Sequence, residues 1–233
     1  VSSYTEHMML KILFEYKGFS EVFQESSWRS DDIADALGLP EELENDKNLR
    51  TVARQLLKGR YKTLQKSTAL VPDLWKQAYE NLASLAQFLQ LNPAEQEIFR
   101  FTMHLRSEEP MRDLLRYLPK SDLQRVAALL ADLLKQPKNQ ILSALKKGSK
   151  LDAYGLIGRD YHTDSVHDYL AWGDTLDFDE FITQPLTEYA LLKSCTEIPN
   201  VPSLQLDDFA HIAGMKDIML TYLQQALTHH QKG

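Results

Sequence analysis

The sequence has a single cysteine, Cys195, so no disulfide bond can form within the chain. No window approaches 18 consecutive apolar residues, so no membrane-spanning helix is expected. Its 9 glycines and 9 prolines are too few for a collagen-like or low-complexity chain. The 233 residues are 43% hydrophobic and 25% charged, which predicts a globular protein with a sizeable core. No basic-then-apolar leader follows Val1, and we expect a reducing, cytoplasmic location.

The net charge is −7, but positive and negative residues are separated along the chain. One run of basic residues without an acid comprises Lys47, Arg50, Arg54, Lys58, Arg60, Lys62 and Lys66. A second such run comprises Lys135, Lys138, Lys146, Lys147 and Lys150. The segment 152–188 is strongly acidic, with Arg159 as its one basic residue. These blocks are either solvated helix faces that attract one another, or surfaces for an acidic partner or nucleic acid.

Apolar residues recur with a period near 3.6 along most of the chain, which predicts a mainly α, multi-helical fold. We expect helices over 6–23 and 31–37, the second capped by Ser30 and ended by Gly38. The apolar positions 49, 52, 53, 56 and 57 predict the buried stripe of a further helix. Pro72 opens a long helix that ends near Leu89, and Asn92 with Pro93 starts the next.

The segment after Ser121 predicts a winged helix-turn-helix-like subdomain. A helix from Ser121 to Leu134 is followed by a turn at Gln136–Pro137 and a short helix from Asn139 to Leu145. The apolar, glycine-containing segment 151–160 then suggests a short β-element. Helix, turn, helix and a short strand pair are the order of a winged helix. Short helices at 176–182 and 187–192 and a final helix within 207–230 complete the expected fold.

In such a module the second helix would be the recognition helix, and Lys138, Lys146, Lys147 and Lys150 could contact phosphates. Asn139 and Gln140 alone on that helix could read base edges, because it carries no arginine. Lysines by themselves give nonspecific, salt-sensitive contact with nucleic acid. Winged helices also serve as protein-interaction modules, and both functions remain open at this point.

Signatures of catalysis or of metal binding are lacking. Segment 59–63 has a glycine and a lysine but not the spacing of a phosphate-binding loop, and 155–158 lacks the third glycine of a dinucleotide site. A weak metal site is conceivable among His162, His167, Asp160, Asp164 and Asp168, although a solvated acidic loop fits those residues better. We therefore expect no catalytic residue and no metal, unless the fold brings distant histidines and acids into one pocket.

The segment 206–219 (LDDFAHIAGMKDIM) resembles the sequence just before the first strand and phosphate-binding loop of AAA+ ATPases. The matching positions are Asp208, Phe209, Ile212 and Gly214. The preceding chain resembles the long helical N-terminal region, with a winged-helix-like unit, of a group of bacterial AAA family proteins. The matching segments are 32–40 (DIADALGLP), 89–97 (LQLNPAEQE) and 145–157.

This resemblance implies three parts: an N-terminal helical region over 1–92, a winged-helix-like region over 93–198, and a linker with the first helix leading into the ATPase over 199–233. It also implies that Ile212, Ala213 and Gly214 border the adenine pocket of a longer protein that uses ATP and Mg²⁺. The phosphate-binding loop, the Walker B acid and the arginine finger are not within these 233 residues, so the chain itself should not hydrolyse ATP.

The implied function is a non-catalytic N-terminal region that recognises or positions a protein client or adaptor, or regulates an ATP-driven ring. Self-assembly would occur through the ATPase module, and no membrane partner is expected. The alternative function is nucleic-acid binding through the basic runs at 47–66 and 135–150.

Overall fold

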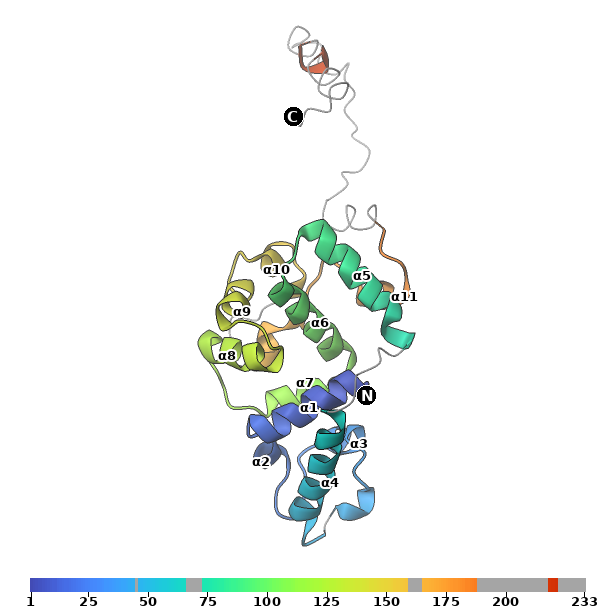
Figure 1. Ribbon diagram of the computed structural model, residues 1–233, viewed down its shortest axis with the longest axis vertical. Helices are drawn as coiled ribbons and strands as arrows, with labels where there is room; N and C mark the ends of the chain where they lie inside the picture. Colours follow the sequence, from blue (N-terminus) through green and yellow to red (C-terminus); the bar gives the residue numbers. More distant parts are fainter. Residues whose placement is uncertain (45, 66–72, 159–164, 188–217, 222–233) are drawn as a thin grey trace. The chain divides into compact units, whose positions relative to one another are not determined.

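The computed structural model describes residues 1–44, 46–65, 73–158, 165–187 and 218–221. The chain forms two compact units, Val1–Cys195 and Thr196–Gly233. The second unit is described only at 218–221, one helical turn on which Ile218 and Met219 are exposed. The first unit is mainly helical, as the sequence predicts, with one small two-stranded sheet among its described residues (Figure 1). Within the described part of the chain, no helix combines the length and hydrophobicity needed to cross a membrane.

The N-terminal part of the first unit consists of helices α1 to α4. Their bounds are α1 Ser3–Glu15, α2 Gly18–Val22, α3 Asp31–Ala36, the 3₁₀ turn η1 Glu41–Leu43 and α4 Leu49–Leu64. The single helix expected over 6–23 is two helices, because Lys17 adopts a left-handed conformation with φ of 64° and ends the first one. Phe19 in the second helix and Phe23 at its C-cap are four residues apart, and their ring centroids lie 4.7 Å from each other in the buried core.

Two helix starts predicted from the sequence are confirmed in atomic detail. The Ser30 hydroxyl accepts a hydrogen bond from the main-chain N–H of Ile33 at the start of α3. Asn92 forms a complete capping box with Glu95, and Pro93 occupies the first turn, where its missing N–H costs nothing. Both caps satisfy main-chain donors that would otherwise lack partners.

Helix α6 is central to the first unit. The next three helices are α5 Asp73–Leu89, α6 Pro93–Ser107 and α7 Glu109–Arg116. Helix α6 packs against α5, α7 and α9, and Figure 1 shows it surrounded by these helices. Ile98, Phe99, Phe101 and Met103 on α6 are fully buried, so two sides of this helix contribute to the core.

The remaining elements begin with the two helices predicted around the turn at Gln136–Pro137, but a further short helix follows them, and the second strand lies outside the expected β-element at 151–160. These elements are α8 Leu123–Leu133, α9 Lys138–Ala144, α10 Lys150–Ala153, β1 Ile157–Gly158, the 3₁₀ turn η2 Val166–Tyr169, β2 Ala171–Trp172 and α11 Phe178–Thr183. Strands β1 and β2 are antiparallel, with Ile157 opposite Trp172. Residues 151–153 of the expected β-element are part of helix α10 instead, and the Ser149 hydroxyl caps this helix. The helix expected at 187–192 lies outside the described residues apart from Thr187, and the final helix expected within 207–230 is described only at 218–221, which are helical.

Helix α1 connects the N-terminal helices to the helix–turn–helix. The Lys11 side chain is buried, and its Nζ donates a 2.7 Å hydrogen bond to the carbonyl oxygen of Asp132 at the end of α8. Tyr16 donates to the Asp132 carboxylate, and this bond is the main reason that the pKa of Asp132 lies below its usual value. The boundary expected after residue 92 therefore falls inside the unit Val1–Cys195.

Candidate functional site

The exposed side of α9 is the first candidate surface. Lys135 has a φ of 54° in the turn after α8, and Pro137 precedes the first residue of α9. Ile141 and Ala144 of α9 are buried, and Leu142 is half-buried against the core. The exposed residues of α9 are Lys138, Asn139, Gln140 and Ser143. This surface is polar and carries no acidic residue within α9.

The four lysines proposed as phosphate contacts do not have the same environment. Lys138, Lys146 and Lys147 are exposed on α9 and the turn that follows it. Lys150 is half-buried, and its Nζ donates hydrogen bonds to the carbonyl oxygens of Leu89, at 3.3 Å, and Gln90, at 2.5 Å. Lys150 thus binds main-chain acceptors at the end of α5, where the helix dipole favours a cation. The structure places three of these four lysines in solvent and one in a packing contact.

A hollow of about 410 Å³ between the end of α6, η2 and β2 is the second candidate. His167 lines it. Its Nε2 lies 2.9 Å from Asp168 Oδ1 and accepts a 3.4 Å hydrogen bond from Arg116 Nε, and its Nδ1 lies 2.8 Å from Ser165 Oγ. Burial is the main cause that lowers the pKa of His167, and Arg116 acts in the same direction while Asp168 opposes it. A neutral His167 between a hydroxyl and a carboxylate is the kind of group that could move a proton.

The contacts of this hollow nevertheless point to a packing role. Among the described residues, those that line it include His167 and Asp168 but not Ser165, so the hydroxyl does not face the space. Arg112 also lines it, and its Nη1 donates to the carbonyl oxygens of Leu105, at 3.0 Å, and Arg106, at 2.6 Å, which satisfies the end of α6. The described residues contain no group of three or more potential ligands that could hold a metal ion. His162, Asp160 and Asp164 lie outside them.

A groove beside α4 is the third candidate, and the sequence did not predict it. Helix α4 buries Leu49, Ala53, Leu57 and Tyr61, four residues apart. Leu56, expected in the core, is instead 47% exposed, and Val52 is half-buried. These two residues line an open groove of about 640 Å³, which we call the α4 groove; its other lining residues are Glu6, Gln55, Gly59, Arg60, Thr63 and Leu64. The apolar residues of α4 cover a wider side of the helix than the four buried positions, because Val52 and Leu56 extend beyond them. This extra width is visible in the sequence and could have predicted the groove.

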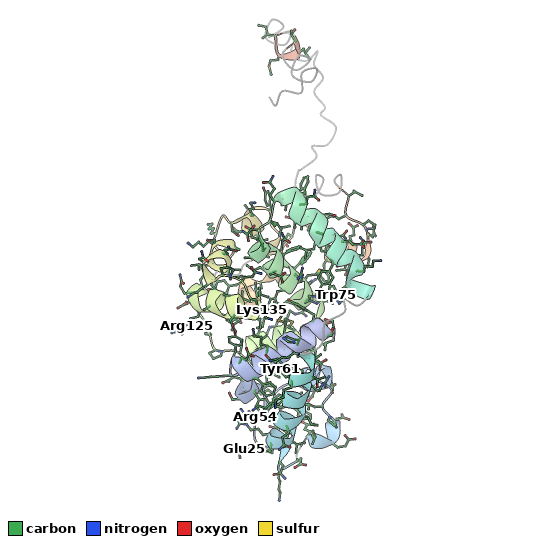
Figure 2. The ribbon with its side chains drawn as sticks, in the orientation of Figure 1. Glu25, Arg54, Tyr61, Trp75, Arg125 and Lys135 are labelled. Carbon is green, nitrogen blue, oxygen red and sulfur yellow. The ribbon has the colours of Figure 1, made fainter. Side chains whose placement is uncertain are left out.

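Helix α4 also carries most of the first basic run. It has five cations and no acidic residue. Arg50, Lys58 and Lys62 are exposed, and the Arg54 guanidinium lies 5.3 Å from the ring centroid of Phe19. Arg60 differs from these because it forms a 2.5 Å ion pair with Glu6 and donates to the carbonyl oxygen of Leu37. Figure 2 shows Arg54 and Tyr61 on this helix.

The residues expected to border an adenine pocket, Ile212, Ala213 and Gly214, lie outside the described residues, as does most of the segment 206–219. Comparison with known proteins adds no relative, since no protein-family profile, curated protein or solved structure matches this chain. The functional proposals therefore depend on the resemblance in the sequence and on the three surfaces described above.

Proposed function

We propose that this chain is the non-catalytic N-terminal region of an AAA family ATPase, and that its first unit recognises or positions a protein partner or regulates the ATP-driven ring. The division of the chain carries this proposal. The first compact unit ends at Cys195, and the second begins at Thr196, shortly before the segment 206–219 that resembles the start of an AAA+ module. A recognition unit followed by a linker and a motor would have its boundary at this place.

The surface of the first unit suits a protein partner. The α4 groove exposes Leu56 beside the polar side chains of Gln55 and Thr63, and Phe88 on α5 is 42% exposed. Exposed apolar residues within a groove rimmed by polar groups are typical of protein-binding sites. The order of α8, α9, α10, β1 and β2 supports a winged-helix-like subdomain, which would contribute a second interaction surface. ATP and Mg²⁺ would bind to the following module in a cytoplasmic protein, with Ile212 to Gly214 at the edge of the adenine pocket.

This proposal can be tested on the longer protein that it implies. We expect that protein to hydrolyse ATP, and we expect deletion of residues 1–195 to preserve basal hydrolysis while changing its response to a client or its assembly. The chain 1–233 alone should not hydrolyse ATP. Steady-state ATPase assays and size-exclusion chromatography of both forms measure these effects. A longer protein without ATPase activity would overturn the proposal.

Nucleic-acid binding is a second candidate function, favoured by the exposed polar side of α9. Lys138, Asn139 and Gln140 stand in solvent at the start of this helix, and Lys146 and Lys147 follow its end. Cations would contact phosphates while amide side chains faced base edges. Because Lys150 is engaged with α5, the expected footprint is smaller than the sequence predicts, and binding should be weak and steeply salt-dependent.

Fluorescence anisotropy with labelled duplex and single-stranded DNA, at low and physiological salt, tests this second function. The double substitution Lys146→Glu and Lys147→Glu should abolish binding. The pair Lys58→Glu and Lys62→Glu on α4 tests whether the first basic run also contributes, and a loss of binding in both variants would assign the footprint to both runs. The absence of binding at physiological salt would leave the protein-partner proposal as the better account.

A further inference from the structure

We propose that a row of cations on α4 contacts the phosphate backbone of a nucleic acid. The row, which we call the α4 cation row, consists of Arg50, Arg54, Lys58 and Lys62. This inference rests on the second candidate function, nucleic-acid binding, and extends the site of that function from α9 to a helix of the N-terminal part. It does not involve the α4 groove, which lies on another side of the helix.

The geometry of the α4 cation row suits a regularly charged strand. Its members are exposed and four residues apart, and each directly follows one of the four buried residues of α4, so the row lies along one side of the helix beside the buried stripe. Neighbouring cations are about 6 Å apart along the helix axis, and the whole row covers about 18 Å. One strand of a DNA duplex carries a phosphate about every 3.4 Å, so this length faces about five phosphates, with a cation for nearly every second one.

The charges of the row are available to a ligand. Within the part of the chain that the structure describes, none of the four cations forms an ion pair. Arg60 on the same helix differs, because Glu6 neutralises it. Glu15 on the neighbouring α1 accepts a hydrogen bond from Tyr61 and lies 3.9 Å from the Lys11 ammonium. A phosphate that binds the row therefore does not have to displace a carboxylate from it.

The side chains around the row favour a nucleic acid over an acidic protein. Leu56, the exposed leucine of α4, is two residues from Arg54 and from Lys58, so it lies about 160° around the helix from each. The uncharged residues exposed beside the row include Thr51 and Gln65. Hydroxyl and amide side chains commonly contact phosphate and sugar. A protein interface instead needs an apolar centre, which the described residues on this side of α4 do not provide.

The second basic run begins near the end of this row, although the two runs are far apart in sequence. The ring centroid of His7 on α1 lies 5.7 Å from that of Tyr61, the residue before Lys62. Burial is the main cause that lowers the pKa of His7, and the charge of Lys135 is the next. Lys135, exposed in the turn before α9, is therefore in the neighbourhood of this end of α4. A nucleic acid that follows the row is led toward the lysines of α9.

The test uses the full chain and a fluorescein-labelled DNA duplex of about 20 base pairs, which is several times longer than the row. Fluorescence anisotropy gives the binding constant at salt concentrations from about 50 to 200 mM, and the slope of its logarithm against the logarithm of salt counts the phosphate contacts. Lys58→Gln with Lys62→Gln removes two contacts, so the slope should become less steep by about 1.8 and the affinity at about 0.1 M salt should fall at least tenfold.

Two control pairs separate contact with the row from general effects of charge and from misfolding. Lys58→Arg with Lys62→Arg keeps both charges and should keep the slope. Lys76→Gln with Lys120→Gln removes the same charge from exposed lysines on α5 and before α8, and it should leave the slope unchanged. Circular dichroism should show the same helix content for all variants, since every substituted side chain is exposed. Poly-glutamate should compete more weakly than unlabelled duplex at equal charge, because its carboxylates are more widely spaced than duplex phosphates.

An unchanged slope in the Lys58→Gln and Lys62→Gln variant, or an equal change in the Lys76→Gln and Lys120→Gln variant, would overturn the proposed role of the row. If Lys146→Glu with Lys147→Glu still abolished binding, the nucleic-acid function would stand with α9 as its site. Poly-glutamate that displaces the duplex at equal charge would show a surface for any polyanion and would also overturn the proposal. A wild-type chain that binds no DNA even at low salt would overturn the second candidate function itself, so the two failures are distinguishable.

Discussion

The protein should lose stability in mild acid because of one buried histidine, His104 on α6. Its imidazole ring lies 4.3 Å from the ring of Tyr4 and 4.3 Å from the ring of Trp75, measured between centroids. Its Nε2 is 2.9 Å from the hydroxyl oxygen of Tyr79. The side chain has no exposed surface. Burial, followed by the positive charge of Arg100, lowers the pKa of His104 to about 3.

The sign and size of the effect follow from proton linkage. The unfolded chain has a histidine of ordinary pKa, 6.5, and binds a proton below that pH, whereas folded His104 stays neutral down to about pH 3. Stability is therefore fully present above pH 6.5 and decreases as the pH falls toward 3. Each pH unit in this window costs about 1.4 kcal/mol, so the interval from pH 6.5 to 4.5 removes roughly 2.7 kcal/mol.

Urea unfolding followed by circular dichroism at several pH values between 7.5 and 4.5 measures this loss. His104→Phe retains an aromatic ring between Tyr4 and Trp75 but cannot titrate. The variant should be less stable at pH 7.5, because Tyr79 loses its partner, yet it should lose about 2.7 kcal/mol less than the wild type on acidification. Other titrating groups, including His7, are present in both proteins and cancel. Parallel stability curves for the two proteins would refute the reasoning.

Three further predictions concern single positions. A Cβ atom at Gly173 would overlap the carbonyl oxygen of Gly155, so Gly173→Ala should cost about 1–3 kcal/mol in urea unfolding. Gly59→Ala is the control, because that helical position has open space around it, and equal costs for the two substitutions would contradict the close approach of Gly173 to Gly155. The Asn81 amide donates hydrogen bonds to the carbonyl oxygens of Phe181 and Gln184 at 2.6 and 2.7 Å. Asn81→Leu should therefore lower the free energy of unfolding by about 3 kcal/mol and accelerate amide hydrogen exchange in 181–186. Unchanged exchange in this segment would contradict the prediction. Gly59→Ala should stabilise the protein by about 1 kcal/mol, because alanine is the better helix former and its methyl group meets no neighbour. Thermal unfolding measures this gain. A lower melting temperature would show that other atoms occupy the space beside Gly59.

Features encoded in a few adjacent residues could be predicted from the sequence. The caps at Ser30 and Asn92 and the two helices around the turn at Pro137 depend on local hydrogen bonding and on proline geometry, which do not require knowledge of the rest of the fold. The short strand at 157–158 was expected in part, since apolar residues and glycines suggested it.

Features that depend on distant contacts could not be predicted. Strand β2 exists because Trp172 pairs with Ile157 and packs 4.9 Å from the ring of Phe99, and nothing local marks 171–172 as a strand. The exposure of Leu56 depends on which side of α4 meets α1, and Lys150 binds α5 through carbonyl oxygens about 60 residues away in sequence. Periodicity identifies an apolar arc, but only packing decides which part of it is buried.

The buried hydrogen bond from Lys11 to the carbonyl oxygen of Asp132 has a consequence for synthesis of the protein on the ribosome. The two residues are separated by 121 positions, and at typical elongation rates the second follows the first by roughly 6 to 24 s. During that interval α1 has been made, but the acceptor for its lysine has not, so the Lys11 ammonium must remain hydrated. Helices α1 to α4 therefore cannot reach their final packing until α8 emerges, although they leave the exit tunnel before it.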